Sequence, residues 1–353
     1  MYAFLQDIHI GAKYSNESLF KSLNTFFGLI KDHKEKCDCI FVCGDLFEHK
    51  LSVEESKTAA LFLANLACNG CGRDGFENVP VHFIHGTYSH DREQYEMFLP
   101  LLEKIPNVDV VYINEVCSGV LRNGATVLYL PQVYDNNINY DELLSHKYDI
   151  IVGHGPISSS TKNPCQAKDT EIVLPVEKLG EASNICVFGH YHGYTDFGNN
   201  VYYGGPWLRW KYGEDEPRKF VFCTSDYKIE TFPNQYALEY KTINIDNAEQ
   251  LREYISQNIS TPHRFTISID DNNIDEYYAI MNINKNNPNI SYKVSYIKQE
   301  EQENDTLKSE YSVSSIEEPI PVLISYIQDK YGIDTTEELH EYESRINNKD
   351  SEK

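Results

Sequence analysis

The chain has 353 residues and a formal net charge of −23 at pH 7, with 41% hydrophobic and 12% aromatic residues. This composition excludes a wholly disordered chain and allows one large hydrophobic core with one or two smaller modules. A protein this acidic is not a broad, non-specific nucleic-acid binder. Any contact with DNA has to be local, assisted by metal ions, or supplied by a basic partner.

The sequence carries no sign of a membrane or secreted protein. It has no run of about 18 apolar residues, so we expect no segment to span a membrane. The first ten residues, MYAFLQDIHI, lack the basic and apolar regions of a secretion signal. The nine cysteines are odd in number, and several lie in apolar runs such as CDCIFVCGD, which is typical of reduced thiols. These features predict a cytoplasmic protein.

Residues 1–238 alternate short apolar runs with amphipathic stretches. Residues 18–35 and 53–67 repeat apolar side chains every three to four positions, which predicts helices. Asn123 and Gly124 form a two-residue hairpin signal. The apolar runs predict strands at residues 2–6, 39–44, 79–86, 108–114, 125–131, 148–155, 184–190, 200–205 and 219–226. Strands separated by helices early and paired directly later favour an α/β sandwich with mixed sheets.

A second alternation occupies residues 239–298 and predicts a small α+β domain. Asp246 is expected to be the N-cap of its first helix. The predicted strands span residues 240–246, 263–270 and 290–298, and the helices span residues 247–258 and 274–284.

Residues 299–318 are acidic and polar, which predicts a flexible linker. Residues 319–346 then predict a pair of short amphipathic helices. Two such helices cannot bury their apolar faces alone, so we expect them to dock on another surface. The candidate contact residues are Leu323, Ile327, Leu339 and Tyr342.

Several predicted strands end in side chains that bind metal ions. Side chains two apart in an extended segment point the same way, so D-x-H and H-x-H each place two ligands on one side. Any one of these dipeptides is more often a turn than a site. Their shared position after apolar strands nevertheless favours one pocket for two divalent ions. The residues are Asp7, His9, Asp45, His90, Asp91, His154, His190 and His192.

The order of these motifs along the chain resembles that of the calcineurin-like metallophosphoesterases: D-x-H, G-D, a motif ending His-Asp, G-H and G-H-x-H. With GHYHG, YYGGPW and DEPRKFVF, the chain more closely resembles the SbcD-type nuclease subunits, including the recombination endonuclease subunits of T-even-type phages. The resemblance implies a four-layer metallophosphoesterase sandwich for residues 1–238. It also implies a DNA-binding capping domain at 239–298, and a C-terminal helical pair that binds an ATPase partner.

The resemblance also implies roles for the candidate site residues. One ion would be held by Asp7, His9, Asp45 and His192, and the other by Asp45, His154, His190 and Ser89. The family has Asn at the last position, and the Ser89 hydroxyl is a shorter and weaker ligand. His90 would act at the scissile phosphate, oriented by Asp91. Mn²⁺ is the expected ion, because imidazole ligands favour it over Mg²⁺. Glu48 is expected either to hydrogen-bond a site histidine or to face water.

The expected activity is 3′–5′ exonuclease and single-strand endonuclease action in DNA recombination, repair and replication. The resemblance implies a homodimer within a heterotetramer with an SbcC-like coiled-coil ATPase, in the cytoplasm of a bacterium or a phage-infected host. Two alternatives remain open: a metallophosphoesterase for another phosphate ester, and a catalytically weakened scaffold subunit of the same complex.

A loop after the last histidine motif mixes basic and aromatic residues. Such a mixture can bind DNA phosphates and stack on bases. A charged, solvated loop is the alternative interpretation. The candidate DNA contacts are Arg209, Lys211, Arg218 and Lys219.

Overall fold

The computed structural model describes residues 1–68, 79–105, 107–132, 137–159, 162, 171–270 and 272–296. Contacts divide the chain into two units, Met1–Lys298 and Gln299–Lys353. The predicted linker and helical pair, with Leu323, Ile327, Leu339 and Tyr342, lie outside the described residues. Within the described part of the chain, no helix is long and apolar enough to cross a membrane.

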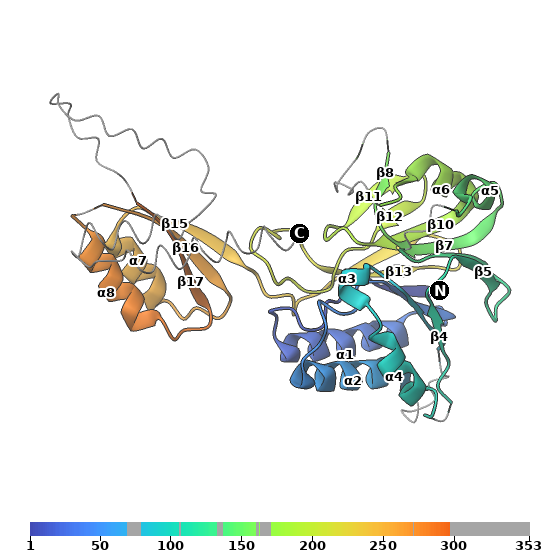
Figure 1. Ribbon diagram of the computed structural model, residues 1–353, viewed down its shortest axis with the longest axis horizontal. Coiled ribbons are helices and arrows are strands. Elements are labelled where there is room, and N and C mark those ends of the chain that lie inside the picture. Colours follow the sequence, from blue (N-terminus) through green and yellow to red (C-terminus); the bar gives the residue numbers. More distant parts are fainter. Residues whose placement is uncertain are drawn as a thin grey trace, which may run out of the picture. The chain divides into compact units, whose positions relative to one another are not determined.

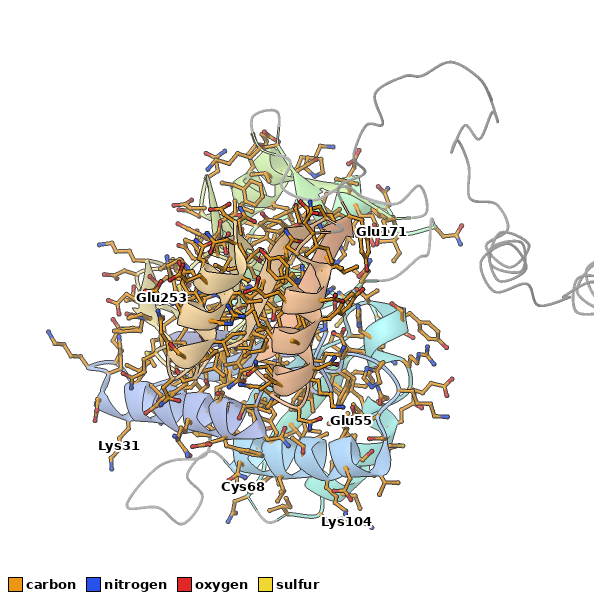
Figure 2. All side chains as sticks on the ribbon, turned by 90° about the vertical axis from the view of Figure 1, so that its left-hand side faces the viewer. Lys31, Glu55, Cys68, Lys104, Glu171 and Glu253 are labelled. Atoms are coloured by element: carbon orange, nitrogen blue, oxygen red, sulfur yellow. The ribbon has the colours of Figure 1, made fainter. Side chains whose placement is uncertain are left out.

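The first of two six-stranded sheets has the order β14-β13-β1-β2-β3-β4. Its strands β1 to β4 run parallel, and β13 pairs antiparallel with both β1 and β14. The strands are β1 (Tyr2–Leu5), β2 (Cys39–Cys43), β3 (Val81–Ile84), β4 (Val110–Ile113), β13 (Lys219–Cys223) and β14 (Ile229–Pro233). Parallel neighbours need crossover connections, and these contain helices α1 (Asn16–Asp32), α2 (Val53–Cys68) and α4 (Tyr95–Leu102). Figure 2, which labels Lys31 on α1 and Cys68 at the end of α2, shows these two helices side by side.

The second sheet has the order β11-β12-β10-β7-β6-β5. Its strands are β5 (Cys117–Val120), β6 (Thr126–Leu130), β7 (Tyr148–His154), β10 (Ser183–Gly189), β11 (Thr195–Gly198) and β12 (Val201–Tyr203). The predicted turn between β5 and β6 is confirmed: Gly124 has φ +90°, and the Asn123 side chain accepts from the backbone N–H of Ala125. Short helices α5 (Tyr140–Leu143) and α6 (Val176–Ala182) and a small sheet of β8 (Ile157–Ser158) and β9 (Leu174–Pro175) accompany this half.

The two sheets pack face to face between layers of helices (Figure 1). Phe4, Phe41, Val127, Val152 and Ile185 belong to the buried core between the sheets. A second core joins the first sheet to α1, α2 and α4, and a third joins the second sheet to α6. The predicted mixed-sheet α/β sandwich is therefore confirmed.

Residues 241–296 form a smaller α/β element with its own core. Its three parallel strands are β15 (Lys241–Ile245), β16 (His263–Ile269) and β17 (Ile290–Tyr296), joined by α7 (Ala248–Ser256) and α8 (Ile274–Asn284). The N-cap of α7 is Asn247 rather than the predicted Asp246. Asn247 has an extended backbone, and its side chain accepts from the N–H of Gln250.

Candidate metal centre

The predicted ligands follow parallel strands at one end of the sandwich. β1 and β2 are neighbours in the first sheet, and β7 and β10 are neighbours in the second. The carboxyl ends of parallel strands meet at one sheet edge, which is where open α/β sheets hold their sites. Ligands from both sheets meet there: Asp7 and His9 after β1, Asp45 after β2, His154 at the end of β7, and His190 and His192 after β10.

The ligand atoms form two adjoining groups. In each group, all ligand atoms lie within 4.8 Å of one another: Asp7, His9 and His192 in the first, and Asp45, His154 and His190 in the second. His9 Nε2 lies 3.9 Å from Asp45 Oδ2, which links the two groups. The structure thus brings the predicted ligands other than Ser89 into two groups, with Asp45, predicted to bridge both ions, grouped only with His154 and His190.

The histidine rings are turned so that Nε2 is free to bind a cation. His154 Nδ1 donates to the Cys43 carbonyl at 2.9 Å; a carbonyl can only accept, so Nδ1 carries a hydrogen, and the neutral ring that binds a metal ion keeps its lone pair on Nε2. His9 Nδ1 lies 2.6 Å from Glu48 Oε2, without the alignment of a hydrogen bond. That carboxylate favours a hydrogen on the same ring atom. Glu48 therefore lies against a site histidine rather than facing water alone, although the contact lacks the geometry of the predicted hydrogen bond.

Unpaired acceptors in the site fit a divalent cation. Asp7 Oδ2 and His9 Nε2 are buried without a hydrogen-bond partner, which is costly unless a cation satisfies them. His154 Nε2 lies 3.2 Å from Asp45 Oδ2. Burial by itself lowers the pKa of His154, but the Asp45 carboxylate outweighs it and raises the pKa to about 9. The site therefore attracts positive charge, and its mixed carboxylate and imidazole donors suit a transition-metal ion.

The backbone of the ligands is strained. Asp7, His9, Asp45 and His190 have φ values of 47°, 50°, 47° and 110°, in the left-handed region that non-glycine residues rarely adopt. Such conformations cost on the order of 1–3 kcal/mol each and cluster at functional sites. Close packing accompanies this strain, since a Cβ on Gly86 would lie only 2.2 Å from the backbone nitrogen of Asp45.

The loop after β3 corrects the prediction for Ser89. Ser89 lies in the short helix α3 (Tyr88–Asp91) and is exposed, whereas the ligands Asp45 and His154 are buried. Thr87 is buried instead, with its N–H donating to Asp45 Oδ1 at 2.6 Å and its Oγ1 3.3 Å from His154 Nε2. The helical turn of α3 separates Thr87 from His90. Thr87 directly follows Gly86 as Asp45 directly follows Gly44, and this shared pattern is the sequence signal that could have pointed to Thr87.

His90 lies beside the first ligand group, but Asp91 does not orient it as predicted. His90 Nδ1 lies 2.5 Å from the Glu48 carbonyl, and its ring meets that of His9 edge-on at 4.8 Å between centroids. Asp91 accepts backbone N–H groups of Gly86 at 2.7 Å, Asp45 at 3.1 Å and Leu46 at 2.9 Å. Asp91 therefore ties the loop after β3 to the loop after β2, because its oxygens are used by these N–H groups.

Two of the four predicted DNA contacts are structural. Arg209 is buried and donates to the carbonyls of Ala237 and Glu216. Arg218 is buried and lies 3.0 Å from Glu214 Oε2. Because both guanidinium groups are buried, the structure does not support a phosphate contact from either residue.

Glu214 connects Arg218 to the metal centre. Glu214 Oε1 lies 3.4 Å from His192 Nδ1, and Arg218 also donates to the His192 carbonyl. Burial by itself raises the pKa of Glu214, but the contacts with His192 and Arg218 outweigh it and lower the pKa to about 2. The carboxylate is therefore ionised and holds the ring of a predicted ligand.

The other two predicted DNA contacts are more accessible. Lys211 is exposed, with Nζ 5.8 Å from the ring centre of Trp210. Lys219 is half-buried, with Nζ 4.4 Å above the ring of Tyr194.

A cleft of about 690 Å³ lies beside the metal centre. Glu48 and Trp210 form part of its wall, and the Trp210 ring lies 4.7 Å from that of His9 and 4.9 Å from that of His192. Sequence reasoning found Lys211 but not the other basic residues of the cleft, because they come from separate parts of the chain. The cleft also carries Lys13, Lys211, Arg264, Tyr212 and Tyr240.

The sequence profile of the family described as calcineurin-like phosphoesterase matches residues 3–194, a span that contains both ligand groups. No curated protein matches the chain. Among solved structures, 31 chains match; one of them has 13% identity and a TM-score of 0.41, covers 66% of this chain and 98% of the other, and is too dissimilar to bear on function. The profile covers more than half of the 353 residues. The chain therefore belongs to the calcineurin-like phosphoesterases, a family of metal-dependent phosphoester hydrolases.

Proposed function

We propose that this phosphoesterase is a DNA nuclease of the SbcD type that uses two divalent ions, Mn²⁺ for preference. The observation that carries the proposal is the cleft beside the metal centre. It combines the cations of Lys13, Lys211 and Arg264 with the rings of Trp210 and Tyr212. Basic grooves with aromatic platforms are typical of proteins that bind single-stranded nucleic acid. This local positive charge, in a chain of net charge −23, meets the requirement for a confined DNA contact.

Bound divalent ions would stabilise charge on the phosphate and supply a nucleophile at neutral pH. Asp7, His9 and His192 would hold one ion, and Asp45, His154 and His190 the other. The Glu48 carbonyl fixes the hydrogen of His90 on Nδ1, so Nε2 is the ring atom that can hold or release a proton. His90 would give that proton to the leaving 3′-oxygen.

The proposal includes an SbcC-like ATPase partner, a homodimer within the complex and a cytoplasmic location. The acidic net charge leaves most of the DNA affinity to the partner. The amphipathic sequence at 319–346 supplies the apolar side chains for docking. Deleting residues 317–353 is expected to leave basal cleavage in place and to abolish binding to the ATPase in a pull-down. Retained binding would refute the docking role.

The test compares cleavage of end-labelled duplex and single-stranded DNA with hydrolysis of bis-p-nitrophenyl phosphate, all with Mn²⁺. Cleavage of both DNA substrates is expected. Lys211→Met should reduce DNA cleavage more than hydrolysis of the small diester, because a short ester does not reach along the cleft. Lys104→Met, an exposed lysine labelled in Figure 2, is the matched control. Hydrolysis of small esters without DNA cleavage would favour another phosphate ester as substrate. Metal binding without any hydrolysis would favour the scaffold alternative.

A further inference from the structure

The Thr87 hydroxyl has three acceptors around it and only one hydrogen to donate. Thr87 Oγ1 lies 2.9 Å from Gln132 Oε1, 3.2 Å from Asp45 Oδ2 and 3.3 Å from His154 Nε2. A His must be neutral to bind a metal ion, and in neutral His154 the Cys43 carbonyl holds the single ring hydrogen on Nδ1, so Nε2 is an acceptor. The neighbour that receives the hydroxyl hydrogen decides what the Thr87 oxygen can do.

Gln132 is arranged to receive that hydrogen. Its Oε1 is the nearest of the three acceptors, and its Nε2 donates to Glu171 Oε1 at 3.1 Å, which turns the amide oxygen toward Thr87. The backbone N–H of Gln132 donates to the His85 carbonyl at 3.2 Å and fixes the segment beside the loop after β3. Gln132 and Thr87 are 7% and 8% exposed, so bulk water does not compete strongly for these bonds.

With its hydrogen on Gln132, Thr87 directs oxygen lone pairs at the second ligand group. The backbone N–H of Thr87 already occupies Asp45 Oδ1 at 2.6 Å, which leaves Oδ2 as the Asp45 oxygen facing His154. With the ring of His154 neutral, Asp45 Oδ2, His154 Nε2 and Thr87 Oγ1 are three acceptors close together in a buried site. Such a group is costly in a protein interior unless a cation satisfies it.

We infer that the Thr87 hydroxyl is a ligand for the ion of the Asp45, His154 and His190 group, and that Gln132 is the positioning residue that makes it one. Glu171 orients the Gln132 amide for this purpose. The inference concerns the metal centre alone, and it holds whichever phosphate ester is the substrate.

The test measures Mn²⁺ binding to the full-length, metal-depleted protein by isothermal titration calorimetry. Thr87→Val keeps the size of the side chain and the N–H bond to Asp45 but removes the hydroxyl. It should weaken one Mn²⁺ site by roughly 10–100-fold and leave the other unchanged, as expected for changes close to a metal. Thr87→Ser should restore binding, because it restores the hydroxyl. Wild-type affinity in Thr87→Val would overturn the inference.

Gln132→Met tests the positioning role separately, because Met has nearly the same length but no amide oxygen. It should weaken the same Mn²⁺ site. The double variant Thr87→Val/Gln132→Met should bind no more weakly than Thr87→Val alone, because Gln132 acts through the hydroxyl. Additive losses in the double variant, or unchanged affinity in Gln132→Met, would refute that role.

Ser89→Ala is the matched control within the same loop, and its Mn²⁺ affinity should equal that of the wild type. Thermal unfolding in excess chelator identifies any variant that fails to fold. If Thr87→Val does not fold, the Mn²⁺ affinities of Thr87→Ser and Gln132→Met still test whether the Thr87 hydroxyl binds the ion. Failure of the nuclease proposal would look different, with normal Mn²⁺ binding and no DNA cleavage.

Discussion

The main-chain carbonyl of Glu48 lies 2.5 Å from Nδ1 of His90. The carboxylate of the same residue lies 2.6 Å from Nδ1 of His9. One residue therefore sets the ring of a predicted metal ligand through its side chain and the ring of the predicted catalytic histidine through its backbone.

His90→Ala should reduce the cleavage rate by roughly 10²–10⁴-fold, the usual contribution of a general acid or base. Metal content should stay at the wild-type level, because His90 is assigned to the leaving group rather than to an ion. Single-turnover cleavage and elemental analysis of the purified variant measure the two quantities. Loss of metal would instead make His90 a ligand, since ligand atoms of His9, Glu48 and His90 also lie within 4.8 Å of one another.

Glu48→Ala should separate the two functions of Glu48. The variant keeps the carbonyl that orients His90 but loses the carboxylate beside His9, so Mn²⁺ affinity should fall by roughly 10–100-fold. At saturating Mn²⁺ most of the cleavage rate should return. Metal titration of activity provides the measurement, and a rate that stays low at saturation would show that the carboxylate has a further role.

Metal chelation should abolish hydrolysis, and Mn²⁺ should restore it better than Mg²⁺. The reason is the histidine-rich ligand set, because imidazole suits transition metals whereas Mg²⁺ prefers oxygen ligands. Metal should also raise the melting temperature, since a ligand present at about 100 times its dissociation constant stabilises the native state by about 2.7 kcal/mol. Full activity in excess chelator would contradict this prediction.

Arg218→Met should destabilise the fold rather than weaken DNA binding alone. It leaves the buried Glu214 carboxylate without its partner at 3.0 Å. Removing one member of a buried ion pair typically costs about 3–5 kcal/mol. Urea unfolding with and without Mn²⁺ measures the change. Lys104→Met, at an exposed position, should change the free energy of unfolding by less than about 0.5 kcal/mol.

His82 should make the metal-free protein sensitive to mild acid. Burial between sheet residues lowers the pKa of His82 to about 4, and its Nδ1 lies 2.7 Å from the Tyr129 hydroxyl. The unfolded chain, with a His pKa near 6.5, binds more protons below about pH 6.5, so stability falls as the pH drops toward 4. His82→Gln should lose about 2 kcal/mol less stability than the wild type between pH 7 and pH 5. Urea unfolding in chelator at both pH values tests this, and parallel losses would refute it.

The sandwich could be predicted because its strands are short apolar runs and its first helices repeat every three to four residues. Helix α4 was missed because it is short and contains Pro100, which hides the helical pattern. The metal ligands could be predicted from the sequence because they directly follow the apolar strands, and this is a local feature of the sequence. The burial of Arg209 and Arg218 could not be predicted from the sequence. It depends on tertiary contacts with Ala237, Glu216 and Glu214. The sequence predicts Ser89 because this residue directly precedes His90, where the family has Asn, and the motif cannot show the helical turn of α3.

The close approach of Gly86 to Asp45 has a consequence for how the loop after β3 can vary. A Cβ on Gly86 would lie 2.2 Å from the Asp45 nitrogen and 2.5 Å from its Oδ1, and neither atom can move without disturbing a ligand. Three positions later, Ser89 is exposed. In a saturation library selected for activity, Gly86 should therefore tolerate no replacement, as if it were itself a ligand, while Ser89 should accept most amino acids. Neutral sequence change in this loop should therefore be found at the exposed turn around Ser89 and not at Gly86.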